Sequence, residues 1–179
     1  MSDSVAAMAV IFIDGNELRA AEIRQIAASL ELVVEALQTG FATSAPEPDH
    51  KARDKVRAHG ATEACFAEAV DLTTLDGKSL RLELDSENEN RFTKWWRETP
   101  ADVQLRVAYR RAGASEIEVV AATCRGRIAD KPAGPQALGW DRLFVPDGDD
   151  RTLAEICAAG ELAEFRRDAY SRVVKALGL

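Results

Sequence analysis

The first thirty residues constrain the fold most strongly, because they join a buried strand to a helix through a glycine turn. The apolar run 7–13 (AMAVIFI) predicts a buried strand that ends at Asp14-Gly15-Asn16. Apolar residues at helical spacing predict an amphipathic helix over 17–30. Unpaired amides and the helix dipole favour a bound anion at such a junction. The chain is therefore expected to begin with an α/β unit that offers a phosphate site.

The rest of the pattern adds antiparallel strands to this unit. Strands are expected at 31–37, 64–67, 72–75, 79–84, 103–110 and 117–128, and helices at 49–59, 88–97, 152–159 and 163–177. Asp49 is the expected N-cap of its helix, Asp76-Gly77 a hairpin turn, and Gly113 the link between two long antiparallel strands. The predicted fold class is α/β, a mixed elongated sheet with flanking helices in a single domain, 1–179.

Composition narrows the classes of function. The net charge of −7 and the pI near 5.0 argue against a nucleic-acid-binding surface, which needs basic patches. The longest apolar run, 5–13, is far shorter than the roughly 20 residues that span a bilayer, and it lacks the basic flank of a signal peptide. Three scattered cysteines suit a reducing compartment. We expect a cytoplasmic protein without a membrane segment.

The segment 126–155 carries a run of uncommon residues in one order. It contains Gly139-Trp140-Asp141, then Phe144-x-Pro146-Asp147-Gly148, then Thr152-x-Ala154-Glu155. This segment resembles the inosine/xanthosine triphosphate pyrophosphatase family, whose members hydrolyse non-canonical purine nucleoside triphosphates to monophosphate and pyrophosphate. The resemblance implies two lobes around a central cleft, a Mg²⁺ or Mn²⁺ ion, a purine triphosphate substrate and a homodimer.

The resemblance also assigns phosphate-binding residues. The family's Thr-Gly-Asn-x-x-Lys-x-x-Glu motif corresponds to 14–22, where Asn16 and Glu22 match and Arg19 replaces the lysine. A guanidinium still binds phosphate, although as a planar fork. Lys55 falls near a second phosphate-binding lysine of the family, and a solvated helix face is the alternative interpretation.

The acids depart furthest from the family pattern. Glu68 matches the first acid of the family's strand-end motif, whereas Ala69 stands where the family has its general base. Asp71 is two residues from Ala69 and so shares its face of an extended strand, but it lies on the face opposite Glu68 unless the chain turns there. We expect Glu68 and Asp71 to be the catalytic and metal-binding acids. Asp14 is either a third metal ligand or a turn residue.

The purine site is assigned from the same resemblance. Trp140 is expected to form a flat wall and Asp141 to accept hydrogen bonds, while Arg166 matches the arginine of the family's closing Ser-His-Arg motif. Phe165 replaces the histidine of that motif, so the base preference is expected to differ. Arg142 is expected to reach either a phosphate or solvent.

Three functions follow as hypotheses. The first is a divergent Mg²⁺-dependent nucleoside triphosphate pyrophosphatase. The second is a member of the family that binds a nucleotide or a protein partner without hydrolysing it, because several chemical positions have changed. The third is a related fold recruited to another nucleotide or sugar phosphate. Trp95 and Trp96 are expected to pack in the interior, with nucleobase or dimer contact as the alternative.

Overall fold

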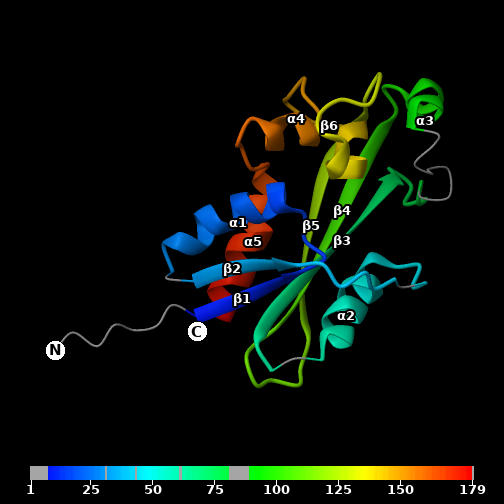
Figure 1. The fold of residues 1–179 in the computed structure, drawn as a ribbon. Coiled ribbons are helices and arrows are strands. Elements are labelled where there is room, and N and C mark those ends of the chain that lie inside the picture. Colours follow the sequence, from blue (N-terminus) through cyan, green and yellow to red (C-terminus); the bar gives the residue numbers. More distant parts are fainter. Residues whose placement is uncertain (1–7, 31, 43, 61, 81–88, 179) are drawn as a thin grey trace.

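The computed structural model describes residues 8–30, 32–42, 44–60, 62–80 and 89–178. They form a mixed sheet with strand order β2-β1-β3-β4-β5-β6 and helices on both faces (Figure 1). The strands are β1 Met8–Ile13, β2 Leu32–Leu37, β3 Ala64–Thr74, β4 Pro100–Arg110, β5 Glu118–Ile128 and β6 Phe144–Pro146. The helices are α1 Glu17–Ala28, α2 Pro48–His59, α3 Glu89–Trp96, the 3₁₀ segment η2 Gln136–Leu143, α4 Leu153–Ala158 and α5 Glu164–Leu177.

The long strands β3, β4 and β5 join two lobes. β1 is parallel to β2 and to the first residues of β3, so this parallel trio occupies one end of the sheet. β3 to β6 pair antiparallel, and β6 joins the last residues of β5 at the other end, near α3 and α4 (Figure 1). The predicted mixed sheet with flanking helices is confirmed.

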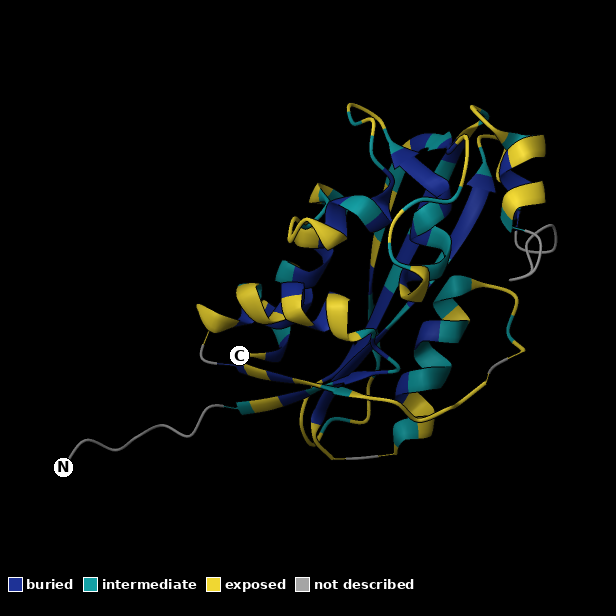
Figure 2. Ribbon diagram, turned by 45° about the horizontal axis from the view of Figure 1, so that its top comes forward, coloured by how far each residue is buried: buried dark blue, intermediate teal, exposed yellow. Residues whose placement is uncertain are grey.

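Strand β3 places its two faces against different helices. Ala64, Phe66 and Val70 face the core beneath α1 and α5, and Phe66 stacks on Phe12 with ring centroids 4.7 Å apart. Cys65, Ala67 and Ala69 face α2. Both faces are buried at this level of the sheet, as the dark blue ribbon of Figure 2 shows. Successive residues of β3 therefore point into different surroundings.

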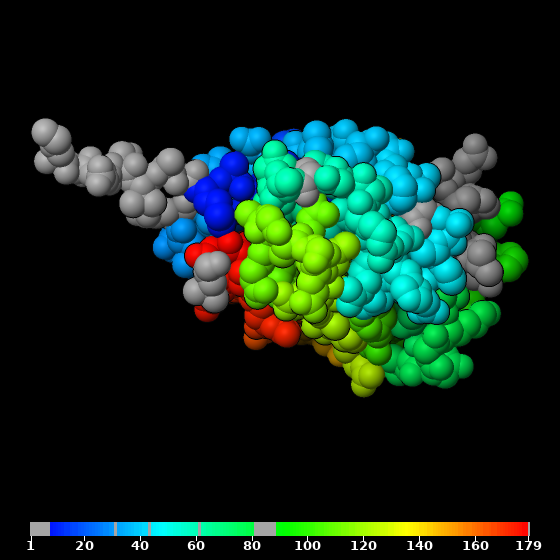
Figure 3. Space-filling model, turned by 90° about the horizontal axis from the view of Figure 1, so that it is seen from below, coloured from blue at the N-terminus to red at the C-terminus, as the bar shows by residue number. Residues whose placement is uncertain are grey.

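Several local expectations are confirmed. Asp76-Gly77 forms the turn, with Gly77 at φ 85° and Leu80 N donating to Leu72 O at 2.8 Å. The β4–β5 connection contains Gly113, whose amide donates to Thr62 O at 2.8 Å. Seen from below in Figure 3, this connection lies beside the segment that carries α2 and the start of β3. The remainder of the expected strand 79–84 and the start of the helix at residue 88 lie outside the described residues.

Two element boundaries differ from expectation. Helix α2 begins at Pro48 with Glu47 as its N-cap, so the prediction of Asp49 as N-cap was wrong. Proline is well suited to the first helical position, where its missing N–H costs nothing. β3 continues without a break from Ala64 to Thr74, whereas the sequence suggested separate strands. Backbone pairing with β4 along almost all of this length keeps β3 continuous. The alternation of residue types in the sequence does not reveal this pairing.

The two tryptophans of α3 differ. Trp96 packs against Phe92, with ring centroids 6.3 Å apart, and borders the core under α3. Trp95 is 77% exposed, so the expectation that it packs in the interior was wrong. Within the described part of the chain, no helix is long and apolar enough to cross a membrane.

Candidate active site

A cleft of about 380 Å³ lies where the two lobes meet. The lining comes from the turn after β1, from α1, α2 and the middle of β3, and from η2 and the start of α5. The polar side chains of the lining are Asp14, Arg19, Lys51, Lys55, Glu68, Asp141 and Arg166. The cleft thus brings together all the residues expected to bind substrate except Asn16, and it includes Glu68 and Asp14 but not Asp71.

Two arginines converge on Asp141 in the wall of this cleft. Arg166 donates Nη1 to Oδ2 at 2.7 Å and Nη2 to Oδ1 at 3.0 Å, a bidentate pair, and Arg19 Nη2 also donates to Oδ2. All three side chains are at most 5% exposed. Burial opposes the charged carboxylate, but the two guanidinium groups outweigh it and lower the pKa of Asp141 to about 2. This triad links α1, η2 and α5.

Glu68 is held from three directions. Tyr170 of α5, which is fully buried, donates its hydroxyl to Glu68 Oε2. Arg19 Nε lies 3.7 Å from Oε1, and Lys55 Nζ donates to the backbone oxygen of Glu68 at 3.2 Å. Burial first, and then the negative charge of Glu68, raise the pKa of Tyr170 well above its usual value, so the phenol remains a donor. The Glu68 side chain is 21% exposed and lines the cleft.

Glu22 is buried beside Arg19, and few groups offset the cost of burying its negative charge. It is 5% exposed, neither carboxylate oxygen accepts from a nitrogen or oxygen donor among the described residues, and the Cys157 thiol beside it helps to lower its pKa. Arg19 Nη1 is 3.9 Å away. Burial raises the pKa of Glu22, and Arg19 lowers it by less. Glu22 matches the family motif, yet it is not among the residues that line the cleft; it lies beside Arg19.

The turn after β1 uses its polar side chains locally. Asp14, at φ 50°, accepts hydrogen bonds from Thr39 N at 2.7 Å and from Thr39 Oγ1 at 2.9 Å. Asn16 caps α1 by accepting from Leu18 N at 2.8 Å and donates Nδ2 to Ala137 O at 2.9 Å. Of the two roles considered for Asp14, the geometry favours the turn residue. Asn16 acts on the cleft by tying α1 to η2.

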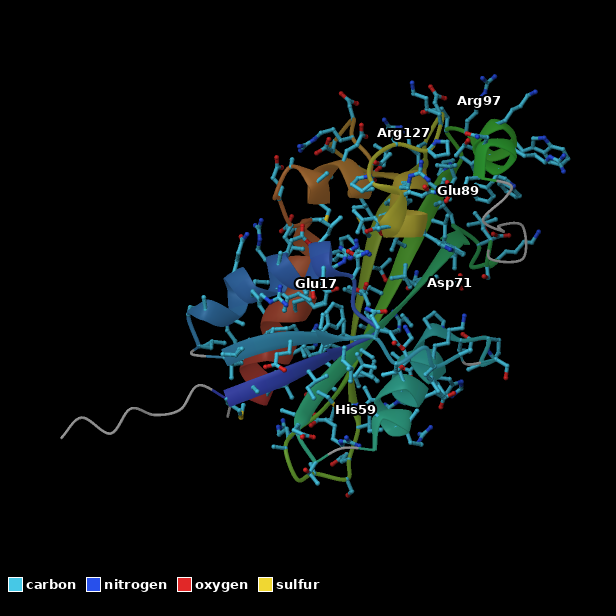
Figure 4. All side chains as sticks on the ribbon, viewed as in Figure 1. Glu17, His59, Asp71, Glu89, Arg97 and Arg127 are labelled. Atoms are coloured by element: carbon cyan, nitrogen blue, oxygen red, sulfur yellow. The ribbon has the colours of Figure 1, made fainter. Side chains whose placement is uncertain are left out.

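Asp71 lies apart from Glu68. Because β3 is continuous, the two carboxylates occupy opposite faces, and Asp71 lines a separate hollow with the loop before α2. Figure 4 shows Asp71 on this α2 side, with Glu17 of α1 on the other. The turn that would bring both acids to one ion is absent from β3 as described. The two carboxylates therefore lie on opposite faces of β3 and line different hollows.

The segment around Gly139, which the resemblance assigns to the base, lines the cleft. Gly139 has φ 49° and ψ −117°, a conformation favourable only for glycine, and open space faces the position of a Cβ atom there. Trp140 is half-buried and Leu138 is buried. The guanidinium of Arg166 lies 5.2 Å from the ring centroid of Phe165. Arg142 was expected to reach either a phosphate or solvent. It instead forms an ion pair with Glu89 of α3, so both expectations are corrected.

Two lysines of the cleft carry positive charge that is not neutralised by a carboxylate of the described residues. Lys51 and Lys55 are one helical turn apart on α2 and both line the cleft. Within the described residues neither forms an ion pair, whereas Arg19 and Arg166 are both paired with Asp141. The lining of the cleft therefore includes, on α2, two positive charges that no described carboxylate neutralises, as well as Gly139 and Trp140.

Sequence reasoning missed Lys51 and Tyr170. Each lies four residues from a residue that was identified: Lys51 precedes Lys55, and Tyr170 follows Arg166. Residues four apart share a helix face. This spacing was the signal available in the sequence for both of them.

The Ham1 family model matches residues 10–175 of the chain. A dITP/XTP pyrophosphatase of Anaeromyxobacter sp. is 34% identical over 114 residues, which cover 60% of this chain and 48% of that protein. A dITP/XTP pyrophosphatase of Mycobacterium tuberculosis is 40% identical over 68 residues, covering 38% of this chain and 30% of that protein. The chain thus aligns with about half, or less, of the length of these relatives.

Solved structures share the architecture. The Ham1 protein of Staphylococcus aureus superposes with a TM-score of 0.64 at 18% identity, over 94% of this chain and 97% of that one. A HAM1 protein from Coxiella burnetii gives a TM-score of 0.63 at 15% identity, over 96% of each chain. At these identities the likeness concerns the fold, in which the cleft lies between the lobes.

Proposed function

Because the chain belongs to the Ham1 family, we propose that it is a nucleoside triphosphate pyrophosphatase that hydrolyses purine triphosphates of the dITP or XTP type to monophosphate and pyrophosphate. The observation that carries the proposal is the cleft, whose lining combines Lys51 and Lys55, neither of which forms an ion pair within the described residues, with Gly139 and Trp140. The lysines suit a polyphosphate and the wall suits a flat base. The names of the relatives support the substrate class.

Within this proposal the side chains take distinct roles. Lys51 and Lys55 bind the phosphate chain, and Trp140 packs against the base. Glu68 is the carboxylate that accepts a proton as water attacks the α-phosphorus and the bond to the departing pyrophosphate breaks. Of the acids lining the cleft, it is far less buried than Asp141, and Tyr170 and Arg19 fix its orientation. Arg19, Asp141 and Arg166 hold the wall in place.

Members of the family are generally dependent on a divalent metal. The acids of the cleft fit such an ion poorly, because each is already engaged: Asp14 by Thr39, Glu68 by Tyr170, and Asp141 by two arginines. Mg²⁺ needs open oxygen ligands. We therefore assign no step to a metal held by these three residues.

Pyrophosphate release from dITP, XTP, ITP, GTP, ATP and pyrimidine triphosphates tests the proposal, with Mg²⁺ or Mn²⁺ present. We expect release from the deaminated purines and a loss of at least about 100-fold in kcat for Glu68→Gln. Glu17→Gln, an exposed change on α1, is the matched control and should retain full activity. Equal turnover by the Glu68 variant would remove Glu68 from the mechanism.

A second candidate function is nucleotide binding without hydrolysis. The observation that favours it is the engagement of every cleft carboxylate, together with Ala69 at the position of the family's base. Calorimetry with a non-hydrolysable purine triphosphate distinguishes the two. Binding combined with no pyrophosphate release under any metal condition would select this function over the first.

We also propose that the protein is a cytoplasmic homodimer. Trp95 of α3, which is 77% exposed, leaves apolar surface available for a contact between subunits. Cys65, Cys124 and Cys157 are free thiols, as a reducing compartment favours. Light scattering coupled to size exclusion gives the mass directly, and a monomer across the micromolar range would contradict the dimer.

A further inference from the structure

Strand β5 has an unpaired edge along most of its length. β4 pairs with one side of β5 almost from end to end, whereas β6 pairs with the other side only at residues 126–128 (Figure 1). After Pro146 the chain turns away from the sheet, with Gly148 at φ 86° and Asp149 N donating to Pro146 O at 3.2 Å. Within the described chain, no strand therefore pairs with the outer side of residues 118–124, which we call the free edge.

The backbone groups of alternate residues along the free edge point away from β4. Ile128 N donates to Thr99 O at 3.0 Å on the β4 side of β5. On the β6 side, Arg125 O accepts from Asp147 N at 3.0 Å. Alternate residues of an antiparallel strand direct both backbone groups to the same side. The outward N–H and C=O groups, which lack a hydrogen-bond partner among the described residues, are therefore those of Val119, Ala121 and Thr123.

The free edge lacks the features that usually prevent pairing with another chain. Natural sheet edges are commonly blocked by charged side chains, by proline or by a covering element. Residues 119–124 read VVAATC, without a charge or a proline, and Ala121 and Thr123 are exposed. The charged residues at its two ends, Glu118 and Arg125, are engaged in ion pairs. The intervening backbone is therefore accessible to a further strand.

A hollow of about 700 Å³ lies along the free edge. Residues 121–125 of β5 and 146–149 at the end of β6 line it, together with side chains of α4 and of the start of α5. Its apolar floor consists of Cys124, Ile156, Ala163 and Phe165. A strand placed beside β5 directs alternate side chains to one face of the sheet, so it would bring them over this floor.

The hollow is rimmed by negative charge. Its acidic lining residues are Asp147, Asp149, Glu164 and Asp168. Arg125 is the one basic residue among the described residues of the lining, and it is paired with Asp102. Asp147 and Glu164 form no ion pair within the described part of the chain. This charge suits a basic partner and disfavours nucleic acid or a surface of acidic lipids.

We propose that the free edge of β5 binds an extended peptide segment of a partner protein that carries apolar and basic side chains. The segment adds to the sheet as a further strand, on the side of β5 that β6 leaves unpaired. Its backbone pairs with Val119, Ala121 and Thr123, which supplies affinity without sequence preference. An apolar side chain over the floor, with basic side chains two residues away on either side, supplies the specificity.

This inference is independent of the pyrophosphatase activity proposed above. Ala121 and Thr123 line the hollow beside β5 and are not among the residues that line the cleft. Changes at the free edge should therefore leave nucleotide binding in the cleft as it is in the wild type. Failure of one proposal does not decide the other.

Fluorescence anisotropy of labelled seven-residue peptides, titrated with the full chain, tests the binding. The probe is Thr-Lys-Thr-X-Thr-Lys-Thr, with X as Val, Ile, Phe or Tyr, which reads alike in parallel and antiparallel pairing. We expect saturable binding, and at least about tenfold weaker binding when Glu replaces Lys or when alternate peptide amides are N-methylated. The N-methylated probe needs no protein variant, so it remains decisive if a variant folds poorly.

Ala121→Pro removes one outward N–H while leaving the pairing of β5 with β4, because proline is tolerated in edge strands. We expect this variant to bind the lysine peptides at least about tenfold more weakly. Ala121→Thr keeps the amide and is the matched control, which should bind as the wild type does. Asp147→Asn combined with Asp168→Asn removes two exposed rim charges and should weaken binding and reduce its dependence on salt.

Amide hydrogen exchange followed by NMR locates the bound peptide. Exchange at Val119, Ala121 and Thr123 should slow on addition of the lysine peptide. Absence of saturable binding by all four lysine peptides, or equal binding of the N-methylated probe, would overturn the proposal. Protection of these amides that grows with protein concentration in the absence of peptide would also overturn it, because a second copy of the chain would then occupy the edge.

Discussion

Glu68 and Asp71 are three residues apart on one strand, yet their surroundings are opposite in kind. Glu68 faces α1 and α5, where a tyrosine hydroxyl and an arginine hold its carboxylate. Asp71 faces the loop before α2, where a serine and one backbone amide bind a single oxygen. The cleft face therefore supplies cationic partners to its acids, whereas on the α2 face Asp71 has no cationic partner among the described residues. The period of two in an extended strand creates this division.

The largest expected effect sharpens this contrast. Asp141→Ala leaves two buried arginines without their carboxylate, so we expect the free energy of unfolding to fall by about 3–5 kcal/mol. Asp71→Asn removes a charge without a cation partner and should change it by less than about 1 kcal/mol. Urea unfolding followed by tryptophan fluorescence measures both. Similar losses in the two variants would show that the two faces do not differ as described.

A fall in pH should lower the free energy of unfolding, because it protonates Asp141. The folded pKa of about 2 lies below the usual value of 3.8, so this group contributes stability above pH 4 and loses it as the pH falls through 2. The contribution is about 2 kcal/mol. Unfolding free energies measured between pH 5 and pH 2 should fall more steeply for the wild type than for Asp141→Asn. Parallel curves would contradict the assignment.

Tyr170→Phe tests how Glu68 is positioned. Removal of the donor should lower the free energy of unfolding by roughly 1.5–3 kcal/mol, as for other hydrogen bonds to charged groups. If the proposed reaction holds, kcat should fall while KM changes little. Tyr109→Phe is the matched control. Tyr109 also donates its hydroxyl to a carboxylate oxygen, Glu118 Oε2, at 2.9 Å, but this pair does not line the cleft. An equal fall in kcat for both variants would deny Tyr170 a specific role.

The smallest effect concerns Glu22. Its raised pKa means that its contribution to stability is fully present below its usual pKa and is lost as the pH rises through the folded value. Glu22→Gln cannot ionise, so we expect it to gain up to about 1 kcal/mol over the wild type at pH 8. The gain should shrink towards pH 4. Thermal unfolding across this range checks the trend, which a constant offset would refute.

The periodic parts of the fold could be predicted from the sequence. Gly113 and the pattern around it predicted β4 and β5, the apolar run before Asp14 predicted β1, and the helical spacing of apolar residues after it predicted α1. The period of two also implied that Glu68 and Asp71 lie on opposite faces, as they do. These features depend on neighbours close in the chain, so local patterns contain them.

The partners in the site could not be predicted in this way. Arg19, Asp141 and Arg166 were each expected to contact substrate, yet they bind one another across 122 and 25 residues of sequence. Tyr170 and Glu68 are 102 residues apart. Such pairs are set by how η2 and α5 pack on the sheet. The short strand β6 and the η2 segment lack a clear period and were missed for the same reason.

The order of the elements along the chain has a consequence for biosynthesis. Arg166 and Tyr170 both lie on α5, which follows every strand of the described sheet in sequence. During translation the sheet therefore emerges from the ribosome before the helix that neutralises Asp141 and positions Glu68. A nascent chain stalled before residue 164 carries the strands and the lysines but lacks both groups. The contacts of Asp141 with Arg166 and of Glu68 with Tyr170 form only when α5 docks on the sheet.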